Sequence, residues 1–122
     1  MAEGFANKYG RDVLVALSAG LTPTRKTPIE TIDVMSERGV DIRDHVPQLY
    51  DPREAAECEV VVNLSGVKLV GVPGKRVVDW KVTDPFGQPI DVYRQVRDEL
   101  EARVMKLILD LRTQAAKAAL AK

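Results

Sequence analysis

The chain has 122 residues, and its 18 lysines and arginines balance 18 aspartates and glutamates, so the formal net charge is zero. This balance gives no electrostatic basis for binding nucleic acid or an anionic membrane, and no apolar run reaches the roughly 20 residues that a membrane span needs. The single cysteine, Cys58, permits no internal disulfide, and the start lacks a secretory leader pattern. These features predict a soluble cytoplasmic domain.

The first predicted element is a helix over Met1–Lys8, because Met1, Phe5 and Tyr9 follow the spacing of one helical face. Helices usually begin after Ser, Thr, Asp or Asn, whose side chains accept hydrogen bonds from the free N–H groups of the first turn. No such residue stands ahead of Met1. We therefore expect that the helix is entered after its natural start and that a preceding segment is missing.

A strand and a second helix are expected next. Residues 13–17 are almost continuously apolar, which is typical of a parallel strand buried on both faces. In the following helix, Thr27 can serve as the cap, Pro28 suits the first helical position and Glu30 completes a capping box. Gly39 is the expected C-terminal stop.

The second half of the chain continues the alternation of helices and strands. A short helix is expected after Asp51, which stands as a cap before Pro52. Two buried-type strands follow, over Val60–Val62 and Arg76–Trp80, and a long helix starts near Asp91. The expected core face of that helix consists of Val96, Leu100, Val104, Leu107 and Leu111.

This order predicts an α/β domain with three αβα layers around a small parallel sheet. Only three strands are visible, fewer than most sheets contain, so the sheet is expected to lack one strand. The domain is expected to span residues 1–112. Residues 113–122 are expected to form an Ala-rich helical tail that frays, because they lack a strong apolar stripe.

Four pieces of sequence occur in a characteristic order: "MAEGF", "SAG", "PIETIDVMSERGVDI" and "VVDWKVTDPFGQPIDVYRQVRDELEARV". Together they resemble the low-molecular-weight protein tyrosine phosphatases and the arsenate reductases that share their fold, over residues 1–112. In that family the first strand leads into a phosphate-binding loop, Cys-x5-Arg-[Ser/Thr], which opens the first helix. The strand lies between the counterparts of residues 13–17 and 60–62. The resemblance implies that this strand and loop are absent here.

The family chemistry depends on that loop. A cysteine thiolate attacks the phosphorus atom, while backbone N–H groups and a bidentate arginine hold the oxyanion. Cys58 does not supply this motif, because the arginine position of a Cys-x5-Arg pattern is Leu64. Cys58 is expected to be a small buried side chain. We therefore predict that these 122 residues are catalytically inactive by themselves, and we expect no metal and no cofactor.

Three residues match the remainder of the family site. The resemblance implies that Asp84 is the general acid, that Phe86 forms an aromatic wall beside the substrate, and that Ser18 supports the phosphate loop. The residues themselves also allow plainer roles. Asp84-Pro-x-Gly is typical of a type I turn, Phe86 suits the core or the surface equally, and Ser18 suits a turn at the end of a strand. His45 is expected to be a surface or loop-packing histidine.

The resemblance implies phosphomonoester hydrolysis through a cysteinyl-phosphate once the loop is restored, with a phosphorylated substrate or oxyanion as the ligand. Thioredoxin-coupled arsenate reductases of this family use two further cysteines after the third strand, and residues 63–75 contain none. Two alternatives remain: an arsenate reductase that uses a small thiol as its reductant, and a pseudo-phosphatase or interaction module without catalysis.

The missing central strand has a physical consequence. Strands that lose their backbone partners expose unpaired N–H and C=O groups, which are costly when buried and recruit other chains when open. We expect direct pairing of residues 13–17 with residues 60–62, an open-edge or strand-exchanged homo-oligomer, or low stability.

Overall fold

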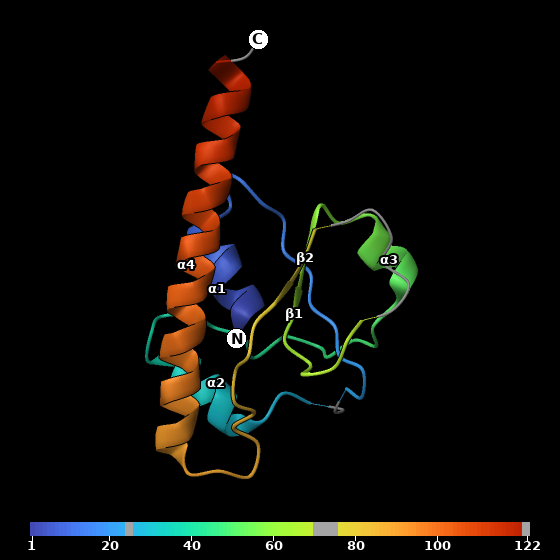
Figure 1. The fold of residues 1–122 in the computed structure, drawn as a ribbon. Helices are drawn as coiled ribbons and strands as arrows, with labels where there is room; N and C mark the ends of the chain where they lie inside the picture. Colours follow the sequence, from blue (N-terminus) through green and yellow to red (C-terminus); the bar gives the residue numbers. More distant parts are fainter. Residues whose placement is uncertain (24–25, 70–75, 121–122) are drawn as a thin grey trace.

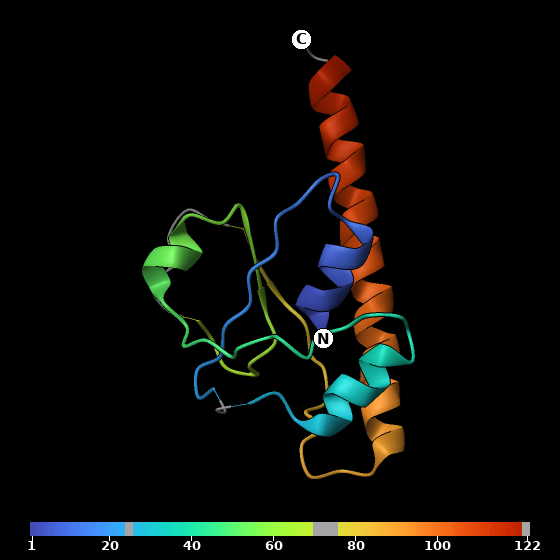
Figure 2. The ribbon, with the colours of Figure 1, turned by 180° about the vertical axis from the view of Figure 1, so that it is seen from behind.

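The fold is known from a computed structural model that describes residues 1–23, 26–69 and 76–120. The elements are α1 (Ala2–Tyr9), α2 (Ile29–Ser36), α3 (Pro52–Ala56), β1 (Val60–Asn63), β2 (Arg76–Asp79) and α4 (Ile90–Leu120). The two strands pair in parallel and lie between two helical layers, with α1, α2 and α4 on one side and α3 on the other (Figures 1 and 2). The predicted α/β class with a small parallel sheet is confirmed. No helix in the described ranges is long and apolar enough to cross a bilayer.

The core lies where α1 and α2 pack on α4. Phe5, Val34, Met35 and Ile108 are fully buried there. The apolar stripe of α4 begins as expected with Val96, Leu100 and Val104, which are all buried. It then continues through Ile108, one residue beyond the expected Leu107. Steps of four residues keep these side chains on the face that α1 covers.

Gly10, which follows the last residue of α1, lies close to Ile108 of α4. A Cβ atom added to Gly10 would lie 2.9 Å from both Cδ1 and Cγ1 of Ile108. Because Ile108 is fully buried, its side chain has little room to move. The glycine therefore sets the distance between the two helices.

The substitution Gly10→Ala is expected to destabilise the fold by about 1–3 kcal/mol, the usual cost of overpacking a core. The matched control is Gly20→Ala, because a Cβ there would meet nothing closer than 3.7 Å. Urea unfolding measures both variants. Equal unfolding midpoints would show that the contact between Gly10 and Ile108 is not tight.

The capping box predicted for α2 is wrong, whereas its stop is confirmed. The helix begins after Pro28 with no side-chain cap, and the hydroxyl of Thr27 is buried without a hydrogen-bond partner among the described residues. At the other end Gly39 has a φ of 71°, and the N–H of Val40 donates to the carbonyl of Met35 at 3.1 Å. This is the pattern of a glycine-terminated helix.

The short helix α3 has the predicted cap. The carboxylate of Asp51 accepts a hydrogen bond from the N–H of Arg53 at 2.9 Å, and Pro52 occupies the first turn. This cap fixes the residue at which the chain enters α3.

The predicted strand over residues 13–17 is wrong. Among the described residues, no backbone hydrogen bond is made by residues 15–19, and the side chains of Val15 and Leu17 are 92% and 68% exposed. Extended chain becomes a strand only when a neighbour completes its ladder. Nor does this segment pair directly with β1, which was one of the expected outcomes. Just after this segment, Gly20 forms an isolated parallel bridge with Leu49.

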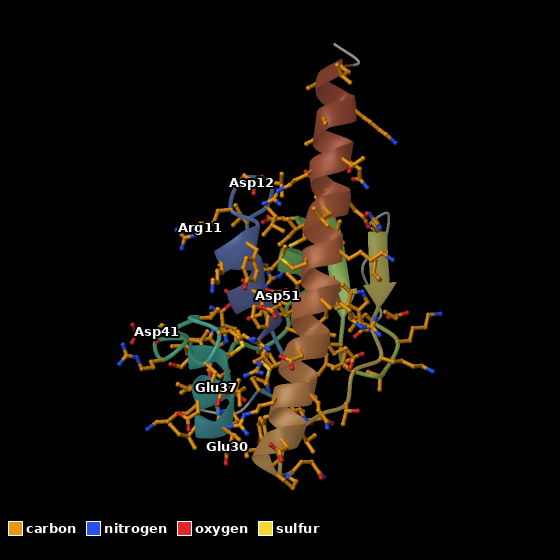
Figure 3. The ribbon with its side chains drawn as sticks, turned by 90° about the vertical axis from the view of Figure 1, so that its left-hand side faces the viewer. Arg11, Asp12, Glu30, Glu37, Asp41 and Asp51 are labelled. Atoms are coloured by element: carbon orange, nitrogen blue, oxygen red, sulfur yellow. The ribbon has the colours of Figure 1, made fainter. Side chains whose placement is uncertain are left out.

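A network of charged side chains joins α2 to α4. Arg97 of α4 is buried, and its guanidinium donates to the carbonyl of Val34 at 3.1 Å, to Glu37 at 2.5 Å and to Asp98 at 2.9 Å. Arg94 adds a second contact to Glu37 at 2.9 Å. Figure 3 shows Glu37 at the end of α2 beside α4. The hydrogen bonds from Arg94 and Arg97 lower the pKa of Glu37, and those from Arg38 and Arg97 lower the pKa of Asp98.

Because the pKa values of Glu37 and Asp98 are lowered, the stability that the charged network between α2 and α4 provides depends on pH. Its contribution is complete above the ordinary pKa values of 4.5 for Glu37 and 3.8 for Asp98, and it is lost as the pH falls through the lower folded values. We expect the urea midpoint to fall between about pH 6 and about pH 3, and Glu37→Gln to reduce that fall. The exposed Glu59→Gln is the control. If both variants keep the wild-type pH dependence, the network does not carry it.

The C-terminal half of α4 also makes polar contacts with the end of α1. Arg112 donates to the carbonyl of Tyr9, the last residue of α1, at 2.7 Å, and pairs with Asp12 at 2.8 Å. Beyond this point α4 continues to Leu120 with its side chains exposed and projects past the body of the domain (Figure 1). The expected helical tail is therefore present as far as Leu120, and its fraying stays a prediction.

Candidate functional site

A cavity of about 800 Å³ opens at the N-terminal end of α1. Its walls come from α1, from the end of the 13–20 segment, from residues 27–28 before α2, from the loop after α2 and from Leu64, which follows β1. In open parallel α/β sheets, ligands bind beyond the carboxyl ends of the strands, where Leu64 lies. The lining residues that bear on the chemistry are Glu3, Ser18, Thr27, Asp41, Asp44 and His45.

Glu3 connects three parts of this cavity wall. It lies in the first turn of α1, where a carboxylate is favoured by the partial positive charge of the helix N-terminus. Its carboxylate accepts a short hydrogen bond from the hydroxyl of Ser18. The Nδ1 atom of His45 lies 3.6 Å from the same carboxylate. The hydroxyl of Ser18 is thus held toward the first turn of α1, and its role in supporting a phosphate loop stays a prediction.

The cavity carries charges of both signs. Glu3, Asp41 and Asp44 contribute carboxylates, whereas Lys8 and Arg11 contribute cations. A hydrogen bond from the guanidinium of Arg43 lowers the pKa of Asp41 to about 2, so this carboxylate stays ionised at ordinary pH. Figure 3 shows Asp41 on the loop after α2. The three carboxylates outnumber the two cations, and the partial positive charge of the helix N-terminus is a further feature of this wall that favours an anion.

Asp84 lies in a tight turn between β2 and α4. Its carboxylate accepts a hydrogen bond from the N–H of Phe86 at 3.0 Å. The turn is closed by the N–H of Gln88, which donates to the carbonyl of Pro85 at 2.9 Å, and Gly87 has a φ of 77°. The predicted type I turn over residues 84–87 is therefore wrong: the hydrogen-bonded turn runs from Pro85 to Gln88, and Gly87 takes the positive φ that the third position of a type II turn requires.

The structure does not gather all the predicted site residues at one place. Ser18 lines the cavity, but neither Asp84 nor Phe86 belongs to its walls. Phe86 is 67% exposed, and it shares the turn of Asp84. The roles of Asp84 as an acid and of Phe86 as an aromatic wall stay predictions.

Cys58 is only partly buried, so the expectation of a small buried side chain is wrong, and its surroundings do not suit a nucleophile. It follows α3 at the amino end of β1, and its thiol donates to the carbonyl of Glu54 at 3.6 Å. Reactive cysteines lie beside cations or at helix N-termini, which stabilise the thiolate. A thiol that follows the C-terminal end of a helix and faces a carbonyl has neither, in agreement with the expectation that Cys58 is not the nucleophile.

Sequence reasoning missed the part played by Glu3 and His45. The two residues stand 42 positions apart in the sequence, and each alone suits a solvated surface. The only signal was indirect: Glu3 falls in the first turn of a helix that has no other capping group. The packing of the loop after α2 against α1 then brings His45 to that carboxylate.

Comparison with known proteins identifies relatives of this chain and solved structures with the same fold. The chain is 35% identical over 113 residues to the glutaredoxin arsenate reductase of Synechocystis sp., a match that covers 88% of this chain and 85% of the relative. It also matches a solved structure of an arsenate reductase in the phosphate-binding state, with a TM-score of 0.82 and 33% identity, over 90% of this chain and 86% of that chain.

A second fold relationship is to the YwlE arginine phosphatase of Geobacillus stearothermophilus, with a TM-score of 0.81 over 95% of this chain and 86% of that one. Its identity of 21% shows the fold alone. No family model matches the sequence. The fold and the relatives define a protein of the low-molecular-weight phosphatase type. Within that type, the chain belongs to the family of the arsenate reductases.

Proposed function

We propose that this chain provides the scaffold of an arsenate reductase that takes its electrons from a small thiol or glutaredoxin. The observation that supports this most strongly is the similarity to the glutaredoxin arsenate reductase over 88% of the chain. In this role the N-terminus of α1 faces the oxyanion, Ser18 steadies the loop that binds it, and Asp84 donates a proton to the departing oxygen.

The cysteine content favours an external thiol over an internal relay. Reduction by a relay within the protein requires further cysteines to resolve the first one, and residues 63–75 contain none. Cys58 lies after α3, where its thiol donates to the carbonyl of Glu54, and it is outside the segment in which the family's relay cysteines lie. We therefore propose that the resolving thiol comes from another molecule. A single unpaired cysteine also agrees with a reducing compartment, and we propose that the protein acts in the cytoplasm.

Phosphomonoester hydrolysis is the second candidate. The observation that favours it is the rigid turn around Asp84, because a leaving alkoxide or phenoxide needs a positioned acid. A non-catalytic interaction module is the third candidate, and it would need no such turn. These candidates differ in whether arsenate, an aryl phosphate or neither is consumed.

The 122 residues alone are expected to be inactive in both reactions, because they contain no Cys-x5-Arg motif. The test incubates the purified chain with arsenate, glutathione and glutaredoxin, and separately with a small aryl phosphate. Activity in either assay that disappears in Asp84→Ala would contradict this expectation. The informative partner is a loop-bearing chain, in which a strand and a Cys-x5-Arg-[Ser/Thr] loop of the family pattern precede Met1.

A further inference from the structure

A buried polar side chain, that of Asn63, lies at the carboxyl end of β1 and is only 6% exposed. Its two N–H donors reach the carbonyl of Val67 at 2.7 Å and the carboxylate of Asp79 at 2.8 Å. Its oxygen accepts hydrogen bonds from the N–H of Ser65 at 3.0 Å and from the hydroxyl of Ser65 at 2.6 Å. The side-chain amide therefore uses both of its donors and both of its acceptor positions.

These four hydrogen bonds tie the loop of residues 64–67 to both strands. Asn63 and Asp79 are register partners in the parallel pair, so they lie beside each other at the end of the sheet (Figure 1). Within the loop, the N–H of Val67 also donates to the hydroxyl of Ser65 at 3.3 Å. A buried amide whose hydrogen bonds are all made holds the backbone around it in one arrangement. We call this set of contacts the Asn63 clamp.

The residue enclosed by the Asn63 clamp is Leu64, which stands between Asn63 and Ser65 and lines the cavity of the candidate site. Residues 64–68 are all exposed, so packing does not hold this loop in place. The position of Leu64 in the cavity wall therefore depends on the backbone on either side of it, which the clamp fixes. A wall that moves must be ordered again whenever a ligand binds, and supporting hydrogen bonds remove that cost.

We propose that Asn63 is a positioning residue of the candidate site, whose amide clamps the loop after β1 to Asp79 and so holds Leu64 in the cavity wall. The effect on ligand affinity rests on the proposed function, whereas the clamp itself does not. Asn63 acts on the site through the loop, and no proton or electron transfer is assigned to it.

The first test uses the 122-residue chain and nuclear magnetic resonance. In Asn63→Ala we expect the Ser65 amide to exchange its hydrogen about tenfold faster, because it loses its acceptor, and the methyl groups of Leu64 to become less ordered. The released groups lie in an exposed loop and can bind water, so the fold is expected to persist. The control is Gln114→Ala, which removes an exposed amide from α4 and should change neither quantity. Unchanged exchange at Ser65, or unchanged order at Leu64, would overturn the proposal.

Exchanging the two side chains separates the hydrogen bonds from the packing of a buried side chain. Asn63→Asp alone sets a second carboxylate against Asp79, and we expect it to loosen the loop as Asn63→Ala does. Adding Asp79→Asn restores one amide and one carboxylate at this position, and the Ser65 amide should regain most of its protection. A double variant that exchanges as fast as Asn63→Asp would overturn the clamp.

The loop-bearing chain tests the effect on the site, with inorganic phosphate as the probe. We expect the dissociation constant of phosphate to rise about 2–10-fold in Asn63→Ala, the cost of ordering one side chain, and to stay unchanged in Gln114→Ala. Equal phosphate affinity with and without Asn63 would overturn its role in the site. A loop-bearing chain that binds no phosphate would instead contradict the proposed function, and the exchange measurements would still decide the clamp.

Discussion

Asp84→Asn in the loop-bearing chain is expected to lower the rate of arsenate reduction by about 10²–10⁴-fold, the usual contribution of a positioned general acid. Asparagine keeps an oxygen that can accept the hydrogen bond from the N–H of Phe86, so the turn is preserved. Asparagine cannot transfer the proton that the carboxylic acid of Asp84 would give to the departing oxygen. The loss should therefore fall on kcat, with KM little changed.

The control for this substitution is Asp91→Asn. Asp91 is an exposed carboxylate at the start of α4 that pairs with Arg94. Asp91→Asn removes one negative charge, as Asp84→Asn does, a few residues further along the chain. If the two variants have equal rates, Asp84 is a turn residue and not an acid.

Ile108→Ala is expected to destabilise the fold by about 2–5 kcal/mol, the cost of removing a buried branched side chain and leaving a cavity. Ile108 is fully buried where α1 meets α4, and it packs in one cluster with Phe5, Met35 and Val104. A domain of this size has a total stability of about 5–15 kcal/mol, so the loss is a large share. The melting temperature is expected to fall by roughly 10 °C.

Leu109→Ala is the matched control for that change. Leu109 is the next residue on the same helix, but its side chain is 55% exposed. The two substitutions have the same effect on helix propensity to within a few tenths of a kcal/mol. Equal loss of stability in both would place the core on a different face of α4.

The parts of the fold that could be predicted are those whose causes lie within a few residues. The cap at Asp51 and the glycine stop at Gly39 depend on local hydrogen bonds and local φ angles, and both are confirmed. The face of α4 follows from its periodicity. The sheet was predictable where β1 and β2 supply each other's ladder.

Two of the failures depend on a neighbour distant in sequence, and a third, at Thr27, is local. Residues 13–17 have the composition of a buried strand, but composition does not supply a pairing partner. Thr27 has the right residue type for a cap, yet the chain enters α2 through Pro28 and directs that hydroxyl elsewhere. The contact between Glu3 and His45 depends on how a loop packs after the helices are in place.

The candidate site, like the fold, could be predicted only in part. Ser18 and Asp84 were found through the family resemblance, and a turn next to Asp84 through its own residues. The cavity could not be read from the sequence, because it is built from five separate segments.

The most direct test of this account is arsenate reduction by the loop-bearing chain, measured with three reductants. Arsenite should form with glutathione and glutaredoxin, not with thioredoxin alone, and not in a version whose loop cysteine is replaced by serine. Absence of arsenite with every reductant, from a chain that is folded by circular dichroism, would contradict the proposed function.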